Sequence, residues 1–373
     1  MGIGDNFRAQ RRPAEGLHLD SAACGRSAVS VLDAVHAHLE LEARAGGYVA
    51  QERAAPALNA GRAALAGLLG VPEAGLALTE SATASLRAVL AAWPLQAGDV
   101  VAVVPSEWGP NLEKFADRGL ELALLDVTGD GLIDLAALER FLASRPPALV
   151  QLTLVASHRG LVQPVAEAAA LCKAAGVPLW VDAAQAIGHV DAACGADVIF
   201  ATSRKWLTGP RGVGMLGVAE PWWGSLKVRI PAMLGGDAPP VRALESDEAN
   251  AAGRVGLAEA VALHMAAGPE AVRARLAEVG RMTRKVLADL PGWEVVGDVD
   301  APCSTTALRP LDGQDPVAVR RRLIDEHRIV TSASAVARAP REMTGPMLRV
   351  SGHLDCSAED LGVLRAALAG LAA

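Results

Sequence analysis

Short apolar segments alternate with amphipathic segments through the middle of the chain. The strand-like runs lie at 76–79, 100–105, 121–127, 148–156, 178–185 and 196–203. Segments with a helical pattern lie between them, at about 84–92 and at 111–119, 134–144 and 165–176. Strands that are apolar along most of their length are typical of a parallel sheet covered by helices on both faces. The pattern therefore predicts an α/β domain built on a parallel sheet.

Two more helices are expected before the sheet. One covers 29–45, and the other covers 56–70, with Pro56 at its start and Gly70 after its last apolar residue. Proline suits the first turn of a helix because the N–H it lacks would have no partner there.

The pattern changes after about residue 230. A Pro/Gly-rich loop at 231–240 is followed by a long helical stretch at about 251–290. The remaining elements are strand-like pieces at 293–297, 304–310 and 348–352, a helix at 317–327 and a last helix. We therefore predict a smaller α+β domain, and divide the chain into a large domain at 16–250 and a small domain at 1–15 and 251–373.

Composition and charge exclude several classes of protein. The 373 residues carry 35 basic and 42 acidic side chains, a formal net charge of −7, so no basic excess exists to neutralise nucleic-acid phosphates. No apolar run approaches the length of about 18 residues typical of a membrane-spanning helix. The first residues also lack the apolar core of a secretory signal. We expect a protein that binds neither nucleic acid nor a membrane.

The five cysteines are scattered along the chain. They are Cys24, Cys172, Cys194, Cys303 and Cys356, and none belongs to a CxxC pair or to a zinc-like arrangement. This usage predicts reduced thiols, a cytoplasmic location and no metal site. The aromatic residues are seven Trp, four Phe and one Tyr, so the core must be mainly aliphatic and each Trp calls for a local explanation.

One glycine-rich segment resembles a dinucleotide-binding loop. Residues 212–217 match the GxGxxG pattern, which binds pyrophosphate only where a strand precedes it and a helix follows it. Here the following residues look like a strand that ends before Pro221. We therefore interpret the match as a strand and not as a nucleotide site.

Two charged residues follow neighbouring predicted strands. Asp182 ends one apolar strand, and Lys205 follows the next, before a Gly-Pro-Arg-Gly loop. The carboxyl ends of parallel strands meet at one edge of the sheet, where ligands bind. Pyridoxal phosphate needs a lysine for its Schiff base and an acid for its pyridinium nitrogen. Taken singly, however, each residue fits a structural aspartate or a surface lysine equally well.

Considered together, the V-D-A-A-Q segment at 181–185 and the S-x-K-W-x-x-G-P-x-G segment at 203–212 resemble the class V branch of the fold-type I pyridoxal-phosphate enzymes. That family includes cysteine desulfurases, kynureninases and C–S lyases, and the resemblance extends from about 17 to 353. It implies a large domain with a mostly parallel seven-stranded sheet, a smaller α+β domain, pyridoxal 5′-phosphate as cofactor, and a homodimer.

The resemblance also implies roles for individual residues. Lys205 matches the catalytic lysine that binds the cofactor and moves the Cα proton. The other matched cofactor-binding positions are Asp182 for the pyridine nitrogen, Gln185 for the phenolic oxygen, Trp108 for stacking on the ring, and Ser81, Ala82, Thr83, Thr202 and Arg204 for the phosphate. Arg349 matches the arginine that binds the substrate α-carboxylate, and the alternative for it is an ordinary ion pair at a strand edge.

Some positions depart from the family pattern. Ser157, a candidate substrate contact, replaces an asparagine that many relatives carry near the ring. Glu248 replaces a threonine with which desulfurases reach the phosphate of the partner subunit. The stretch 329–347 contains no cysteine, whereas a desulfurase needs a nucleophilic thiol shortly before the carboxylate arginine. Cys356 lies beyond Arg349, so persulfide formation is not expected.

Three segments, at 16–29, 43–56 and 252–261, resemble the C–S lyases of ergothioneine biosynthesis. This implies β-elimination from a small cysteine conjugate, hercynylcysteine sulfoxide, with release of pyruvate and ammonia. Tyr48, in a predicted loop after two glycines, is a candidate for cation–π contact with the trimethylammonium group; a packing role is the alternative. Other class V activities (desulfurase-like, aminotransferase, epimerase or kynureninase-like) and a non-catalytic scaffold stay open.

Overall fold

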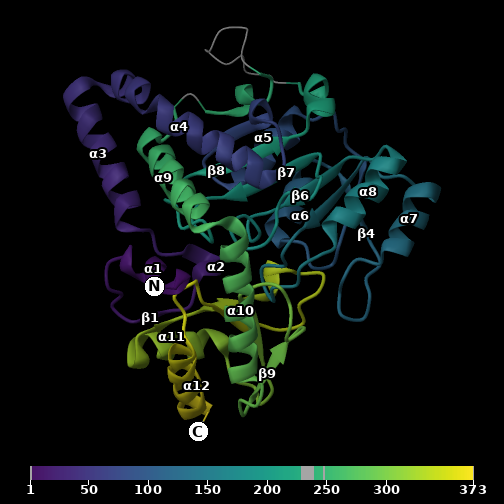
Figure 1. Cartoon of the computed structure of the whole chain (residues 1–373). Helices are drawn as coiled ribbons and strands as arrows, with labels where there is room; N and C mark the ends of the chain where they lie inside the picture. The colour runs from purple at the N-terminus through teal and green to yellow at the C-terminus, as the bar shows by residue number, and fades with distance from the viewer. Residues whose placement is uncertain (1, 228–238, 247, 373) are drawn as a thin grey trace.

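A seven-stranded sheet forms the centre of the larger part of the molecule (Figure 1). The computed structural model describes residues 2–227, 239–246 and 248–372. The sheet has the order β2-β8-β7-β6-β5-β3-β4. Its strands are β2 (Leu76–Thr79), β3 (Val100–Val103), β4 (Glu121–Leu124), β5 (Leu149–Thr153), β6 (Leu179–Asp182), β7 (Val198–Thr202) and β8 (Gly214–Val218). Only β8 runs against its neighbours, so the prediction of a mostly parallel sheet is confirmed.

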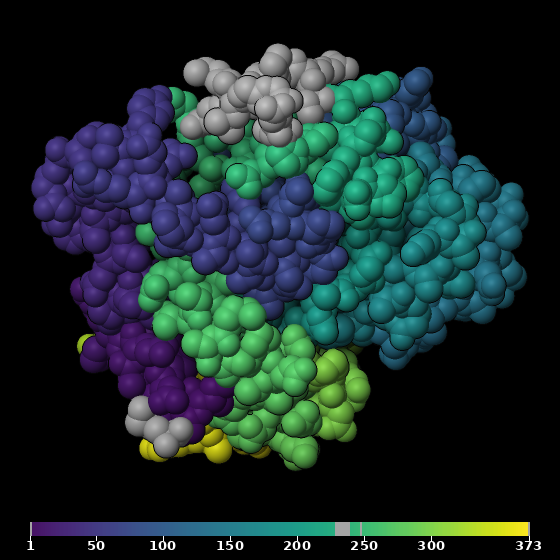
Figure 2. All heavy atoms as spheres, turned by 45° about the horizontal axis from the view of Figure 1, so that its top comes forward, coloured from purple at the N-terminus to yellow at the C-terminus, as the bar shows by residue number. Residues whose placement is uncertain are grey.

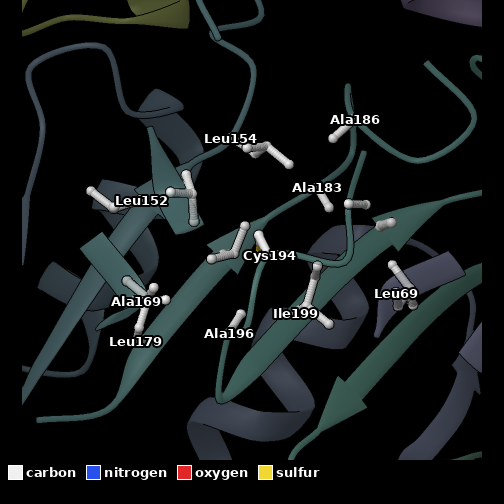
Figure 3. Close-up of a cluster of buried hydrophobic side chains, with 14 of the residues drawn as sticks. Leu69, Leu152, Leu154, Ala169, Leu179, Ala183, Ala186, Cys194, Ala196 and Ile199 are labelled. Atoms are coloured by element: carbon white, nitrogen blue, oxygen red, sulfur yellow. The ribbon is translucent and has the colours of Figure 1, made fainter. Parts of the chain in front are cut away.

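Apolar side chains cover both faces of this sheet. Along β6, Leu179 and Val181 belong to one core cluster and Trp180 to another, because successive side chains of a strand point to opposite faces. Figure 3 shows the first cluster, in which Leu179, Ile199 and Leu152 lie together with Ala183 and Leu69. The helices of this region are α5 (Ala82–Ala92), α6 (Gly109–Asp117), α7 (Leu135–Ser144) and α8 (Val165–Ala175). Two-sided burial explains why these strands are almost continuously apolar.

Helices α3 (Val29–Ala45), α4 (Gly47–Leu69) and α9 (Ala251–Ala267) pack against one another. The expected helix start at Pro56 is wrong, because α4 begins at Gly47 and contains Pro56 in its interior. Proline removes one backbone hydrogen bond, but the flanking Ala, Gln, Glu and Arg residues favour a helix on both sides. Gly46, with a φ of +89°, separates α3 from α4.

The helical stretch expected at 251–290 is two helices. Gly268, with a φ of +81°, ends α9, and Pro269 begins α10 (Pro269–Leu287), as the preferences of glycine and proline for helix ends predict. In Figure 2, α4 crosses the centre of the face shown, and the green helices α9 and α10 lie beside it. Since α9 packs on α3 and α4, whereas α10 contacts β10 and α12, we propose to divide the domains at Gly268 and not after residue 250.

The smaller part contains an antiparallel sheet of order β12-β13-β10-β9. Its strands are β9 (Trp293–Val296), β10 (Thr305–Pro310), β12 (Ser332–Ser334) and β13 (Met347–Ser351). Helices α11 (Pro316–His327) and α12 (Ala358–Ala372) pack beside it, and a short η4 helix (Val336–Arg338) connects β12 to β13. The predicted smaller α+β unit is confirmed.

The N-terminal segment joins this smaller part. It contains α1 (Ile3–Ala9), β1 (Leu17–His18) and α2 (Ser21–Cys24), and β1 pairs in parallel with β11 (Ile329–Val330). Short η helices lie at Glu73–Gly75, Glu220–Ser225 and Arg242–Leu244. Most of the Pro/Gly loop expected at 231–240 lies outside the described residues. None of the described helices combines the length and apolar character that crossing a bilayer requires.

Candidate active site at the carboxyl edge of the sheet

A cavity of about 220 Å³ lies where the carboxyl ends of the parallel strands meet the smaller part of the molecule. Asp182 is the last residue of β6, and Lys205 follows three residues after the end of β7. The predicted residues that line the cavity are Ser81, Ala82, Thr83, Trp108, Ser157, Asp182, Gln185, Thr202, Arg204, Lys205 and Arg349. The fold thus brings together residues that are spread over more than two thirds of the sequence.

Asp182 is held as a hydrogen-bond acceptor on both oxygens. The Ala184 N–H donates to its Oδ1 at 2.8 Å, and Asn111 Nδ2 donates to its Oδ2 at 2.9 Å. Burial raises the pKa of Asp182, whereas Lys205 and these two donors lower it. A carboxylate fixed in this way is suited to accept a further hydrogen bond from a protonated ring nitrogen.

Lys205 lies in the same cavity, close enough to interact electrostatically with Asp182. Burial lowers the pKa of Lys205 to about 7, Asp182 opposes that shift, and the charges of Arg204, Arg349 and Arg338 add to it. A substantial fraction of the amine is therefore neutral near pH 7. A neutral lysine amine is the nucleophile needed for a Schiff base and the base needed to remove a proton.

Three of the predicted phosphate-binding positions, Ser81, Ala82 and Thr83, lie at the N-terminus of α5. Ser81 caps this helix, with the Ala84 N–H donating to its Oγ at 3.0 Å, and Ala82 and Thr83 line the cavity beside it. A helix N-terminus attracts anions through its free N–H groups and its dipole. Gly214 permits this arrangement, because a Cβ there would lie only 2.3 Å from the carbonyl carbon of Ser81.

Thr202 and Arg204 complete this end of the cavity. Arg204 donates to the carbonyl of Ala23 in α2, and burial lowers its pKa. Its charge and the helix N-terminus form a donor set that matches a phosphate. Together with Lys205 and Asp182, this donor set fits pyridoxal phosphate.

Gln185 connects the cavity to its surroundings. Its Nε2 donates to the carbonyl of Ala22 at 2.8 Å, and its Oε1 accepts from Trp206 Nε1 at 2.9 Å. The second hydrogen of Nε2 stays available for a phenolic oxygen. Trp206 in turn stacks on His189, with ring centroids 3.7 Å apart, so the amide is held from both sides.

Arg349, on β13, enters the cavity from the antiparallel sheet and is fully buried. Its Nε donates to Ser332 Oγ at 3.0 Å, its Nη1 donates to the Ser157 carbonyl at 2.7 Å, and its Nη2 lies 3.4 Å from Asp20 Oδ1. The ion pair considered as an alternative is therefore present, and the residue also lines the cavity. Ser157 contributes its backbone oxygen to this contact.

Tyr48 and Glu248 lie elsewhere. The Gly-Gly-Tyr segment belongs to the start of α4 and not to a loop, and Tyr48 is 81% exposed. It is absent from the lining of the cavity, so this chain does not bring it to the other predicted site residues. Glu248 is also exposed, in the connection that precedes α9.

A sequence profile described as aminotransferase class-V matches residues 17–364. The chain belongs to this family. Membership confirms the predicted family and identifies the protein as an enzyme that uses pyridoxal 5′-phosphate, the cofactor that the donor set fits.

Two relatives illustrate the range of this class-V group. A probable hercynylcysteine sulfoxide lyase from Mycobacterium tuberculosis is 48% identical over 369 residues, which cover 98% of this chain and 93% of the relative. An isopenicillin N epimerase from Streptomyces clavuligerus is 30% identical over 338 residues, which cover 83% of each protein.

Solved structures of low sequence identity share the fold. A cysteine desulfurase from Escherichia coli superposes with a TM-score of 0.84 at 22% identity, covering 98% of this chain and 97% of the other. The cystine C–S lyase C-DES superposes with a TM-score of 0.83 at 20% identity, covering 95% and 98%. These similarities confirm the predicted fold-type I architecture.

The sequence interpretation missed Glu107, which lies behind Asp182 in this class-V site. Glu107 is fully buried, and its Oε1 accepts from Asn111 Nδ2 at 2.9 Å and from the Trp108 N–H at 3.0 Å. Burial, and then the nearby Asp182 charge, raise the pKa of Glu107 to about 8. One amide thus bridges two carboxyl groups, of which Glu107 carries the proton near pH 7.

Glu107 has a further polar neighbour in Gln151. Its Oε2 and the Oε1 of Gln151 have no hydrogen-bond partner among the described residues, and the Gln151 side chain lies within interaction range of Glu107. A hydrogen bond from the Gln151 side chain lowers the pKa of Glu107 and so opposes the larger effect of burial. The only sequence signal was the position of an acidic residue directly before Trp108.

Arg338 is the second residue that sequence reasoning missed. It lies in η4 and lines the cavity. It belongs to the stretch at 329–347, which contains no cysteine. No local motif in this stretch marks its arginines as site residues.

Proposed function

We propose that this enzyme is a carbon–sulfur lyase of ergothioneine biosynthesis that cleaves hercynylcysteine sulfoxide by β-elimination. The observation that carries the proposal is the cavity itself, which combines Lys205, Asp182 and Arg349 and has no cysteine among its described lining residues. The 48% identity to the probable lyase from Mycobacterium tuberculosis supports the choice of substrate.

Each residue then has a defined task. Arg349 binds the α-carboxylate of the substrate and fixes the orientation of Cα. Lys205, whose lowered pKa leaves its amine partly neutral, removes the Cα proton. When bound, pyridoxal phosphate supplies an electron sink for the pair left at Cα. Asp182 keeps a proton on the ring nitrogen, which makes that sink effective.

The bond changes balance without an added oxidant or thiol. The Cα–H bond breaks, a double bond forms between Cα and Cβ, and the Cβ–S bond breaks with its electron pair on sulfur. The sulfur fragment leaves as a sulfenate and takes up one proton. The 2-aminoacrylate that remains reacts with water to give pyruvate and ammonia.

A panel of substrates tests this function. We expect the enzyme loaded with pyridoxal phosphate to release equal amounts of pyruvate and ammonia from hercynylcysteine sulfoxide, and little sulfide from cysteine. Lys205→Ala is the control for background elimination. Comparable amino-group exchange between alanine and a keto acid, or sulfide release from cysteine as the fastest reaction, would contradict the lyase assignment.

We also propose that the enzyme is a homodimer that works in the cytoplasm. Resemblance to fold-type I enzymes supports the dimer, and the five cysteines, all free in the structure, are compatible with a reducing compartment. Light scattering after size-exclusion chromatography tests the oligomeric state. A monomeric mass for the fully active enzyme would exclude the dimer.

A further inference from the structure

Among the residues that the structure describes, Arg338 forms no close ion pair. Arg338 lines the cavity, with its guanidinium carbon 5.0 Å from the centroid of the Trp108 ring. Among residues 2–227, 239–246 and 248–372, no carboxylate lies within 4.0 Å of it, and its Nε is buried without a hydrogen-bond partner. The side chain is half-buried, and a buried donor without a partner is costly, so this arrangement suits an acceptor oxygen of a ligand in the cavity.

The other cationic side chains around the cavity already have partners or assigned roles. Lys205 has Asp182 nearby, and Arg349 lies beside Asp20. Arg204 lies with the phosphate-binding positions, and Arg349 receives the substrate α-carboxylate. None of these assignments leaves Arg338 a carboxylate of its own: burial and then the Arg349 charge lower its pKa to about 10, and Asp20, which opposes that shift, already pairs with Arg349.

The backbone holds Arg338 in this place. The η4 turn lies directly against the first residue of α6, because a Cβ on Gly109 would lie 2.1 Å from the carbonyl oxygen of Ala337. The ring of Trp108, the neighbouring residue, lies under the guanidinium. Such contacts restrict the side chain before any substrate arrives, which reduces the entropy lost on binding.

We propose that Arg338 is a specificity-determining residue that binds a negatively charged or strongly polarised oxygen on the sulfur side of the substrate. The inference rests on the proposed lyase function. With the α-carboxylate at Arg349 and Cα at Lys205, the part of the substrate left for Arg338 is the sulfur and its substituent. Two groups there carry such an oxygen: the sulfoxide, and a distal carboxylate on the substituent.

The experiment uses three matched conjugates: S-methyl-L-cysteine sulfoxide, its thioether S-methyl-L-cysteine, and S-carboxymethyl-L-cysteine sulfoxide. The holoenzyme is compared with Arg338→Gln, Arg338→Lys and the control Arg341→Gln, which removes an exposed arginine from the same connection. The readouts are kcat and KM for pyruvate release, and calorimetric dissociation constants in a Lys205→Ala background, where no turnover occurs.

We expect Arg338→Gln to lower kcat/KM about 10- to 100-fold, the range for a charge-assisted hydrogen bond. A loss on both sulfoxides but not on the thioether assigns Arg338 to the S–O oxygen. A loss confined to the carboxymethyl conjugate, in KM and in the dissociation constant, assigns it to the distal carboxylate. Arg338→Lys should retain part of the effect in either case.

An equal loss on all three conjugates, or no loss on any, overturns the proposal. Unchanged cofactor absorbance and melting temperature of Arg338→Gln show that the variant is folded and loaded. Failure of the lyase function has a different signature: the wild-type enzyme then releases no pyruvate from any sulfoxide, while the calorimetric comparison of the variants still tests the binding role of Arg338.

Discussion

The cofactor side of the cavity comes from the seven-stranded sheet, whereas the substrate side comes from the antiparallel sheet and its connections. On the cofactor side, both oxygens of Asp182 and both ends of the Gln185 amide are hydrogen-bonded within the protein. On the substrate side, the Nε of Arg338 has no partner among the described residues. The first side is fixed by hydrogen bonds within the protein, as suits a permanent occupant, whereas Arg338 on the second side keeps a free donor for a ligand that comes and goes.

The largest effect is expected for Lys205→Ala, on which both sides depend. Without the amine, the Cα proton has no acceptor, and pyruvate release should fall about 10⁴-fold, the upper range for general base catalysis. The exposed Lys173 on α8 provides the matched control, and its replacement by Ala should leave the rate unchanged. A Lys205→Ala enzyme with a rate within tenfold of wild type would falsify the assignment of the base.

A smaller effect is expected for Asp182→Asn, which tests the cofactor side alone. The amide keeps the shape but loses the negative charge facing the ring nitrogen, so activity should fall roughly 100-fold, equivalent to about 3 kcal/mol. The absorbance of the bound cofactor should change with it. Asp197 also accepts hydrogen bonds, from the Leu179 N–H at 2.8 Å and Trp222 Nε1 at 2.7 Å, but lies outside the cavity lining. Asp197→Asn should therefore leave the absorbance as it is, and equal spectra for the two variants would exclude this role for Asp182.

Gly214→Ala tests the phosphate end of the cofactor side. The added methyl group would lie 2.3 Å from Ser81, so either β8 or the turn before α5 must move. Overpacking typically costs about 1–3 kcal/mol, and we expect the affinity for pyridoxal phosphate to fall about tenfold or more in a fluorescence titration. Gly67→Ala is the control, because a Cβ on that residue of α4 meets no atom within 4 Å. If both variants bind the cofactor like the wild type, the close approach of β8 to Ser81 is not needed for binding.

The effect expected for Glu107→Gln is on stability and not on catalysis, and it depends on pH. Glu107 ionises near 4.5 in the unfolded chain but only at about pH 8 in the folded protein. Between these values the folded state binds more protons, so the contribution of Glu107 to stability decreases as the pH rises. Gln does not titrate, so the stability of the variant relative to wild type should increase by up to about 1.4 kcal/mol per pH unit across this window.

Urea unfolding at several pH values between 5 and 8 measures this difference. A difference between Glu107→Gln and wild type that is constant with pH would show that Glu107 is already ionised in the folded protein. Glu113, an exposed residue of α6, is the control, and Glu113→Gln should show no such trend.

The strands and the cofactor side were accessible from the sequence because local signals determine them. Strands buried on both faces are apolar throughout, and Asp182 and Lys205 follow such strands directly. Pro56 misled the prediction, since one lost hydrogen bond is tolerated inside a long helix whose other residues favour it. Tyr48 was assigned to a loop because two glycines precede it, although α4 starts there.

The substrate side was less accessible because its residues act only through contacts that are distant in sequence. Arg338 reaches the cavity because η4 lies against Gly109. No local sequence pattern predicts this contact. Glu107 is a site residue only through Asn111, which it shares with Asp182. Arg349 could be placed by its resemblance to the family, but its pairing with Asp20 could not.

The junction between the two ends of the chain has a consequence for the order of folding during translation. Leu19 donates to Val330 and accepts from Ser351, and Asp20 lies beside Arg349. Leu19 and Asp20 leave the ribosome long before Val330, Arg349 and Ser351, although domains usually fold from the N-terminus onward. A nascent chain can therefore assemble the parallel sheet with Asp182 and Lys205, but it cannot complete the substrate side until residue 351 has emerged, so no partly synthesised chain is an active lyase.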